Sequence, residues 1–293
     1  RLLMTLPSKD TIVTYPQGDT ESVGEVLHVE ALDQGLYAVI LDKTAFHPED
    51  SHWPDQPSDE GVMITDNGPL TIVEAVTGGI NGDVLKLGED LPVRMGTPEW
   101  TFVVAHLVPG PPPEVGSTVR IEVDADNRRQ LNAAHTGCHI AATALDEVLT
   151  DKWTKPAPKD SLGNPAFDAL AMQHSRMSPG VSRDSYRVGK SLRRKGFPAD
   201  GFDDPEGIAQ RVNERLEEWV AAGGPVVIES AGPGLSDRRQ WECHVSAGTI
   251  SMPCGGTHLE DVSEFDSVTI ELEVLDAPGG KEIRMTTRAS VKD

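Results

Sequence analysis

The first 120 residues consist of short segments in which apolar and polar residues alternate. Residues 118–123 show this clearly, because their apolar side chains fall at every second position, which is the period of a half-buried strand. Glycine, proline, aspartate and asparagine separate the segments at spacings typical of a small barrel or sandwich. We therefore predict an N-terminal β-barrel domain over residues 1–120, with strands at 23–29, 36–41, 71–76, 83–87, 101–107 and 118–123.

A helical period begins after residue 125. Apolar residues such as Leu131, Ala134 and Cys138 recur at steps of three and four, which indicates an amphipathic helix. Asp126 or Asn127 is the expected N-cap of this helix, because a short polar side chain can accept a bond from the first free backbone amides.

A second helix is predicted from Asp204 to about residue 222, since a capping aspartate is followed directly by proline. Its expected buried stripe consists of Ile208, Val212, Leu216, Trp219 and Val220. Strands are expected at 225–229, 241–250, 268–274 and 282–287, whereas residues 151–203 show no clear period. This mixture indicates an α+β domain with a largely antiparallel sheet over residues 121–293.

Composition narrows the function. The chain has 26 lysines and arginines against 47 aspartates and glutamates, a net charge of -21, which argues against a DNA-binding protein that holds nucleic acid over its whole surface. No apolar run reaches the length of a membrane span, so we expect a cytoplasmic protein without a membrane partner. Three cysteines are too few for a disulfide framework.

One basic cluster stands out in this acidic chain. Six of the thirteen residues from Arg183 to Lys195 are arginine or lysine. The cluster is either a solvated helix face or a flexible segment that contacts phosphates. Tyr186 lies within the cluster and Phe197 just after it, and either one could stack on an unpaired base or belong to the core.

Two separate pairs of residues have the sequence spacing that is typical of metal ligands. His135 and His139 are four residues apart on the first predicted helix, so their imidazoles share one face. Cys254 and His258 are also four apart, with a Gly-Gly-Thr segment between them. Together they form a complete set of nitrogen and sulfur donors, which favours Zn²⁺ in either a closed structural site or a catalytic one.

The segments His135-Thr-Gly-Cys-His139 and Cys254-Gly-Gly-Thr-His258 resemble the metal motif of the alanyl-tRNA editing family. This family comprises the AlaX proteins and the editing domains of alanyl- and threonyl-tRNA synthetases. Residues 42–49 and 56–61 also resemble family blocks. The resemblance implies a β-barrel packed on a zinc-bearing α/β editing domain, with mischarged aminoacyl-tRNA as the partner.

The resemblance also implies roles for individual residues. Zinc would be bound by His135, His139, Cys254 and His258. Both helical histidines and Thr44 are counted as catalytic. Thr44 would contact a hydroxyl of the amino acid, and Gln56, Gly255 and Gly256 would help to bind the substrate. The basic residues expected to hold tRNA are Arg187, Lys190, Arg193, Arg194 and Lys195.

The chain departs from the family pattern in residues 50–55, where a glycine-rich turn is replaced by a longer loop without glycine. This loop carries His52, which we predict to act as a general base or extra ligand, and His47 replaces a family tyrosine. A changed loop predicts a changed pocket. The amino acid is therefore expected to resemble serine or threonine, with fluorothreonine as a candidate for a specialised member.

Three functions remain open from the sequence. The first is a free-standing, zinc-dependent aminoacyl-tRNA deacylase. The second is a metal-dependent hydrolase of a small or carrier-linked ester, which the charge of -21 favours. The third is a binding module in which four ligands close a structural zinc site.

Overall fold

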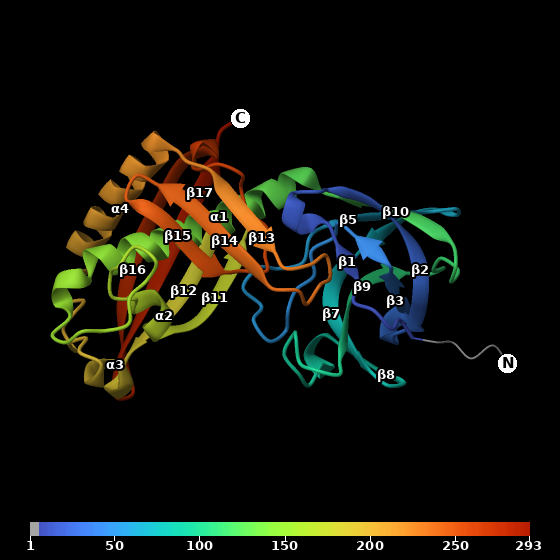
Figure 1. Cartoon of the computed structure of the whole chain (residues 1–293), viewed down its shortest axis with the longest axis horizontal. Helices are drawn as coiled ribbons and strands as arrows, with labels where there is room; N and C mark the ends of the chain where they lie inside the picture. Colours follow the sequence, from blue (N-terminus) through green and yellow to red (C-terminus); the bar gives the residue numbers. More distant parts are fainter. Residues whose placement is uncertain (1–5) are drawn as a thin grey trace. The chain divides into compact units, whose positions relative to one another are not determined.

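The computed structural model describes residues 6–293, which form a mixed α+β fold with mostly antiparallel sheets, as the sequence predicts (Figure 1). The chain divides into two compact units. Unit 1 contains the chain up to Arg128 together with Ser230–Arg239 and Gly255–Thr257. Unit 2 contains Arg129–Glu229, Gln240–Cys254 and His258–Asp293.

Unit 1 is built from strands joined by turns and loops. The strands are β1 (Ile12–Val13), β2 (Glu21–Ala31), β3 (Leu36–Leu41), β4 (Lys43–Thr44), β5 (Gly61–Thr65), β6 (Gly68–Ile72), β7 (Glu74–Asn81), β8 (Val84–Leu87), β9 (Thr101–Pro109) and β10 (Thr118–Val123), and the 3₁₀ turns are η1 (Tyr15–Gln17), η2 (Asp33–Gly35) and η3 (Gly88–Asp90). Eight strands form a curled, half-barrel sheet in the order β6-β5-β10-β2-β3-β9-β7-β8, while β1 and β4 pair in parallel (Figure 1).

Alternation along the strands explains this sheet. In β10, Val119, Ile121 and Val123 are buried while Thr118 and Arg120 are exposed, as expected where one face covers a core. The predicted strand at 71–76 is wrong as a single element, because the chain leaves β6 and enters β7 at Val73. A run of apolar residues does not reveal such a break.

Unit 2 combines helices with two sheets. Its helices are α1 (Ala125–Val148, which starts in unit 1), α2 (Phe167–Ala171), α3 (Lys190–Arg194) and α4 (Pro205–Ala222), with 3₁₀ turns η4 (Thr150–Lys152) and η5 (Val262–Glu264). Its strands are β11 (Met172–Ser178), β12 (Val181–Val188), β13 (Val226–Ser230), β14 (Arg239–Val245), β15 (Gly248–Pro253), β16 (Phe265–Ala277) and β17 (Gly280–Val291). The sheet orders are β11-β12-β17-β16 and β13-β14-β15.

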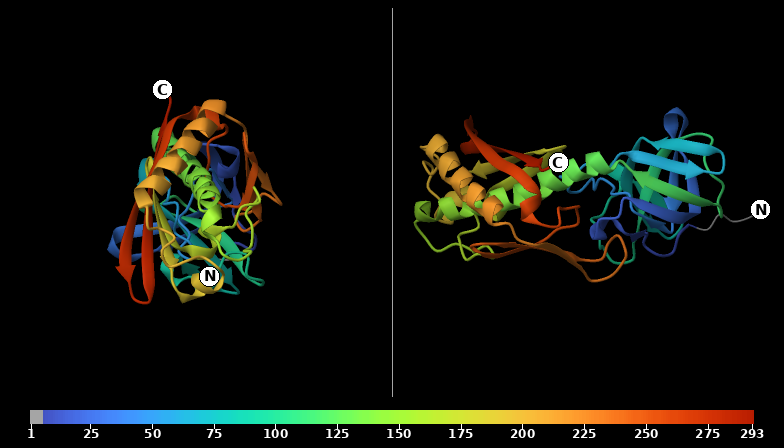
Figure 2. Two further views of the ribbon diagram at one scale, coloured as in Figure 1. Left: turned by 90° about the vertical axis from the view of Figure 1, so that its left-hand side faces the viewer. Right: turned by 90° about the horizontal axis from the view of Figure 1, so that it is seen from above.

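Helix α1 runs between these two sheets and forms the centre of unit 2 (Figure 2). Its buried residues Ile140 and Leu145 share one apolar core with Met285 of β17 and Trp241 of β14. Gly137 permits close packing here, since a Cβ at this position would lie 3.0 Å from the Cβ of Ala289. The helix face that carries the paired histidines is therefore fixed by packing on both sides.

The predicted N-cap of α1 is wrong by two to three residues. The carboxylate of Asp124 accepts a hydrogen bond from the backbone amide of Asn127 at 3.0 Å, and the helix begins at Ala125. The sequence is ambiguous here because Asp124, Asp126 and Asn127 lie within four positions and each of them can cap a helix.

Helix α4 follows its prediction. Asp204 accepts a bond from the Gly207 amide at 3.0 Å, and Pro205 is the first helical residue. Ile208, Val212, Leu216 and Trp219 of the predicted stripe are buried, whereas Val220 is only partly buried.

Two interpretations of the sequence need correction in unit 2. The strand predicted at 241–250 is a hairpin of β14 and β15. The basic cluster is not a flexible segment, because it lies on strand β12 and helix α3. Tyr186 and Phe197 are both fully buried and belong to the core, so neither is exposed for base stacking.

Candidate metal centre

The four residues predicted to bind metal come together in unit 2. Helix α1 supplies His135 and His139, and the segment after β15 supplies Cys254 and His258. One ligand atom from each lies within 4.8 Å of all the others. His135 and His258 are buried and the other two are partly buried, so the group is largely shielded from water.

The distances inside this group fit a tetrahedral site. Cys254 Sγ lies 3.3 Å from Nε2 of His135, 3.4 Å from Nε2 of His139 and 3.2 Å from Nε2 of His258. Zinc bonded to sulfur and imidazole nitrogen at its usual lengths would separate these atoms by about 3.5 Å. The donor set can therefore hold a metal ion, and its three imidazoles and one thiol are consistent with zinc.

Thr136, a residue that the sequence analysis did not select, holds His258. Its Oγ1 lies 3.1 Å from His258 Nδ1 and accepts a bond from the Leu259 amide at 3.0 Å. A bond at Nδ1 leaves Nε2 directed at Cys254, which is how outer residues commonly orient a histidine ligand. The sequence signal that could have identified Thr136 is its position directly after the predicted ligand His135.

His139 is held in an apolar setting. The ring of Trp241 contacts it edge-on, with centroids 4.9 Å apart, and Trp241 itself is fully buried. Burial lowers the pKa of His139 from 6.5 to about 4. The imidazole is therefore neutral at pH 7, which is the form that binds metals.

In unit 1, Thr44 and His106 form a buried relay of hydrogen bonds. His106 Nδ1 lies 2.9 Å from the Val39 carbonyl, which can only accept, so Nδ1 carries the proton. The other nitrogen must then accept from the Thr44 hydroxyl at 2.8 Å. Thr44 Oγ1 also accepts from the Phe46 amide at 3.1 Å. Its proton is thus committed, and only a lone pair is left for another partner.

Two further contacts order the motif residues of unit 1. Gln56 Nε2 donates to Thr257 Oγ1 at 2.7 Å, and the Thr257 amide donates to Gln56 Oε1 at 2.9 Å. Arg128 and Asp59 form a buried ion pair with Nη2 and Oδ2 2.6 Å apart. The side chains of this pair are 3% and 0% exposed.

The remaining predicted residues lie in different settings. His52 is exposed, and its Nε2 donates to the Leu91 carbonyl at 2.8 Å. His47 is buried, and burial lowers its pKa to about 4. Gly255 is exposed and Gly256 is buried.

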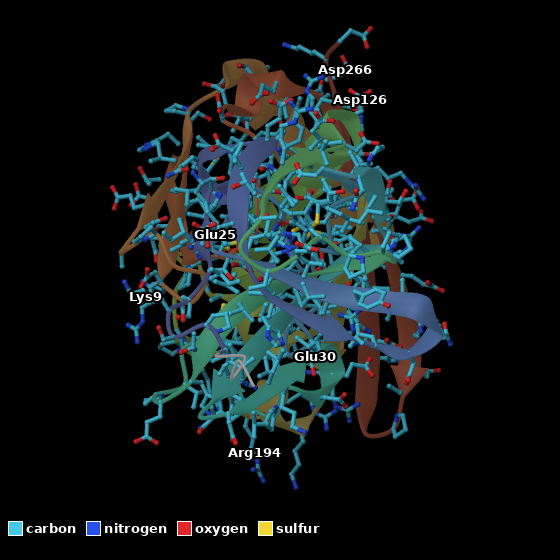
Figure 3. The ribbon with its side chains drawn as sticks, turned by 90° about the vertical axis from the view of Figure 1, so that its right-hand side faces the viewer. Lys9, Glu25, Glu30, Asp126, Arg194 and Asp266 are labelled. Carbon is cyan, nitrogen blue, oxygen red and sulfur yellow. The ribbon has the colours of Figure 1, made fainter. Side chains whose placement is uncertain are left out.

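The predicted tRNA-binding residues lie at the end of β12 and along α3. Arg187 donates to the Pro278 carbonyl at 2.5 Å and Arg193 to that of Gly279 at 3.4 Å. Lys190, Arg194 and Lys195 are exposed, and the Arg194 side chain extends away from the fold (Figure 3).

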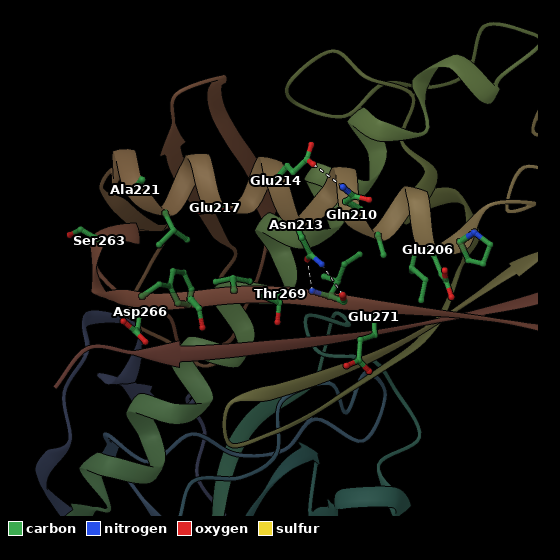
Figure 4. A pocket seen from close by; sticks show the side chains of 18 of the residues that line it. Glu206, Gln210, Asn213, Glu214, Glu217, Ala221, Ser263, Asp266, Thr269 and Glu271 are labelled. Atoms are coloured by element: carbon green, nitrogen blue, oxygen red, sulfur yellow. Dashed lines mark hydrogen bonds between the residues drawn. The ribbon is translucent and has the colours of Figure 1, made fainter.

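A large groove lies away from the histidine residues, between α4 and the edge strand β16 (Figure 4). Its volume is about 950 Å³, and Glu206, Glu214 and Glu217 of α4 line it. Asn213 crosses the groove and bonds both the amide and the carbonyl of Ile270. None of the four candidate metal ligands lines this groove.

Within residues 6–293, no helix is both long enough and apolar enough to cross a membrane. No family model matches the chain. Individual proteins do match it. The chain is similar to alanine–tRNA ligases.

The similarity to these ligases extends along most of the chain. The chain is 34% identical to the ligase of Pyrobaculum neutrophilum, and the match covers 80% of this chain and 22% of the ligase. It is 28% identical to the ligase of Halorubrum lacusprofundi over 90% of this chain and 24% of the ligase, and 28% identical to that of Corynebacterium jeikeium over 83% and 23%. The chain therefore spans about a quarter of the length of these ligases.

Proposed function

We propose that the chain is a metal-dependent aminoacyl-tRNA deacylase that hydrolyses the ester between tRNA and a serine- or threonine-like amino acid, with fluorothreonine as a candidate. The convergence of His135, His139, Cys254 and His258 is the observation that carries this proposal. Similarity to alanine–tRNA ligases supports tRNA as the partner. Such an activity would take place in the cytoplasm, where charged tRNA is used.

The four donors would hold zinc, which when bound lowers the pKa of water and polarises an ester carbonyl. Thr136 keeps Nε2 of His258 directed at the ligand group, and Trp241 shields His139 from water. These contacts hold the donors in the orientation that a metal ion requires.

Selection of the amino acid is assigned to Thr44. Because its own proton is donated to His106, Thr44 can accept a hydrogen bond from a substrate hydroxyl but cannot donate one. A site of this kind favours side chains with a hydroxyl over those without one, since the lone pair would otherwise be buried without a partner. Gln56, Gly255 and Gly256 are proposed to shape the same binding site, and His52 to supply a base.

The proposal is tested by deacylation of a panel of aminoacyl-tRNAs with metal-replete protein. His135→Ala and Cys254→Ala should each lower the rate by on the order of a thousandfold and remove the bound metal, which is measured by elemental analysis. His244→Ala is the matched control, because His244 is exposed on β14 and should leave both quantities unchanged. Full activity in the two ligand variants without bound metal would refute the mechanism.

The same assays separate the two alternatives. The net charge of -21 favours a hydrolase of small or carrier-linked esters. Hydrolysis of such esters without tRNA, at a rate that changes little with salt concentration, would support this alternative. The completeness of the four-donor set favours a closed structural site. In that case a chelator would unfold the protein together with any loss of activity.

A further inference from the structure

The four-stranded sheet of unit 2 has two faces of opposite character. Alternate residues of β12 and β17, such as Tyr186, Ile283 and Met285, point into the core shared with α1. The residues between them point the other way. Both α1 and the sheet β13-β14-β15 lie on the core side, so they leave the outer face uncovered (Figure 2).

Arginines gather on this outer face. Register places Arg183 of β12 opposite Arg176 of β11 on one side and Thr286 of β17 on the other. Arg284 and Arg288 lie two residues before and after Thr286, so they share the same face. All four arginines are exposed.

The arginines on these strands outnumber the nearby carboxylates. Arg284 lies 3.3 Å from Glu282 of its own strand. Among residues 6–293, by contrast, no carboxylate forms an ion pair with Arg176, Arg183 or Arg288. Unpaired guanidinium groups are unexpected in a chain with 47 acidic residues, and like charges directly opposite each other on a sheet are unfavourable. An anion lying on the face would remove that repulsion.

The edge strand β16 limits this surface on one side. Glu271 and Glu273 lie opposite Thr286 and Arg284 and point to the same face. A polyanion is therefore repelled from β16 and confined to β11, β12 and β17. At the end of β12 the surface continues to Arg187 and α3, about 13 Å along the strand from Arg183.

We propose that the outer face of β11, β12 and β17 is the docking surface for the phosphate backbone of tRNA. Guanidinium groups suit this ligand because their planar donors bind phosphate oxygens in pairs. A flat, open sheet can contact successive phosphates without reading bases. This inference takes the identity of the RNA from the proposed function, but the surface itself rests on the strand register and the unpaired arginines.

The test is binding of uncharged tRNA by the full chain over a series of salt concentrations. In the triple variant Arg176→Gln, Arg183→Gln, Arg288→Gln, affinity at low salt should fall about tenfold or more, and the salt slope by about two. A control triple variant, Arg94→Gln, Arg120→Gln, Arg211→Gln, makes the same charge change at exposed sites elsewhere. It should bind within about twofold of the parent chain.

Thermal melting of the parent chain and of both glutamine triple variants detects a folding defect. The triple Arg→Lys variant keeps the charge at the same sites and should recover part of the lost affinity, although without paired donors. Equal weakening of both glutamine triples, or no weakening of either, would overturn the docking surface.

The outcomes separate this inference from the proposed function. If the chain deacylates tRNA but the glutamine triple binds like its control, the surface is wrong and the function stands. If no charged tRNA is hydrolysed but uncharged tRNA binds through these arginines, the function is wrong and the surface stands. A parent chain that binds no tRNA overturns the surface directly.

Discussion

Two buried polar regions of the molecule differ in how their groups are satisfied. In unit 1 the Arg128–Asp59 pair and the relay from Thr44 to His106 and Val39 match their donors with acceptors of the protein. In unit 2 the ring nitrogens of three histidines converge on one thiol at 3.2–3.4 Å. The first arrangement is complete by itself, whereas the second has the composition and spacing of a metal site.

Burial of a histidine has a different consequence in each of the two regions. It lowers the pKa of both His106 and His139 to about 4, so both imidazoles are neutral at pH 7. In unit 1 neutrality fixes the direction of the Thr44 hydrogen bond. In unit 2 it leaves a lone pair for a cation. The same physical effect thus prepares one region for recognising a hydrogen-bond donor and the other for holding a metal.

Breaking the ion pair of unit 1 should give the largest effect on stability. Asp59→Asn leaves Arg128 buried with an unpaired charge, which typically costs about 3–5 kcal/mol. Glu122→Gln is the control, because its partner Arg120 is 54% exposed and such surface pairs contribute only about 0–1 kcal/mol. Urea titration measures both changes. Equal costs would show that the polar network of unit 1 is not self-sufficient.

The pH dependence of stability should test the His106 relay next. The unfolded histidine takes up a proton near pH 6.5, whereas the buried one stays neutral until about pH 4. Stability is therefore highest above 6.5 and falls as the pH is lowered towards 4, by about 3 kcal/mol in total for this group.

His106→Gln removes this titration and keeps an acceptor for Thr44. Its stability should vary less between pH 6.5 and 4 than that of the parent chain, as measured by urea titration at several pH values. His47 and His139 titrate equally in both proteins, so the difference reports His106 alone. Identical pH profiles would mean that His106 is not held neutral by burial.

The contrast also shows which features a sequence can predict. Strand β10 and the cap of α4 follow from local patterns, and the metal group follows from residue spacing on a helix and a turn. The arginine surface does not, because it depends on the register of Arg183 with Thr286, about a hundred residues later. Local periodicity carries no information about which strands become neighbours.

The sites of unit 1 show the same limit on a smaller scale. The resemblance pointed to Thr44, but the hydrogen-bond direction at its hydroxyl depends on His106, which is 62 residues away. Similarly, Asp59 was part of a motif, whereas its partner Arg128 lies 69 residues later. The partner of a buried polar group is determined by packing, so a motif identifies the group without identifying what satisfies it.

The smallest predicted effect concerns the contact by which Thr136 orients His258, one of the four candidate metal ligands. Thr136→Val removes the hydroxyl that lies 3.1 Å from His258 Nδ1 while keeping the side-chain shape. Loss of such an outer contact typically weakens metal affinity about ten- to a hundredfold. Competition with a chelator of known affinity measures this change.

Thr143→Val is the matched control for Thr136→Val. It makes the same substitution at a buried position of α1, but the Thr143 hydroxyl bonds only the backbone carbonyl of His139, at 3.0 Å. Metal affinity should therefore change much less than in Thr136→Val. If both variants bound metal like the parent chain, the orientation of His258 would be set by the backbone of its own segment. The metal group would then be as self-sufficient as the network of unit 1, and the contrast between the two regions would lie in their donors alone.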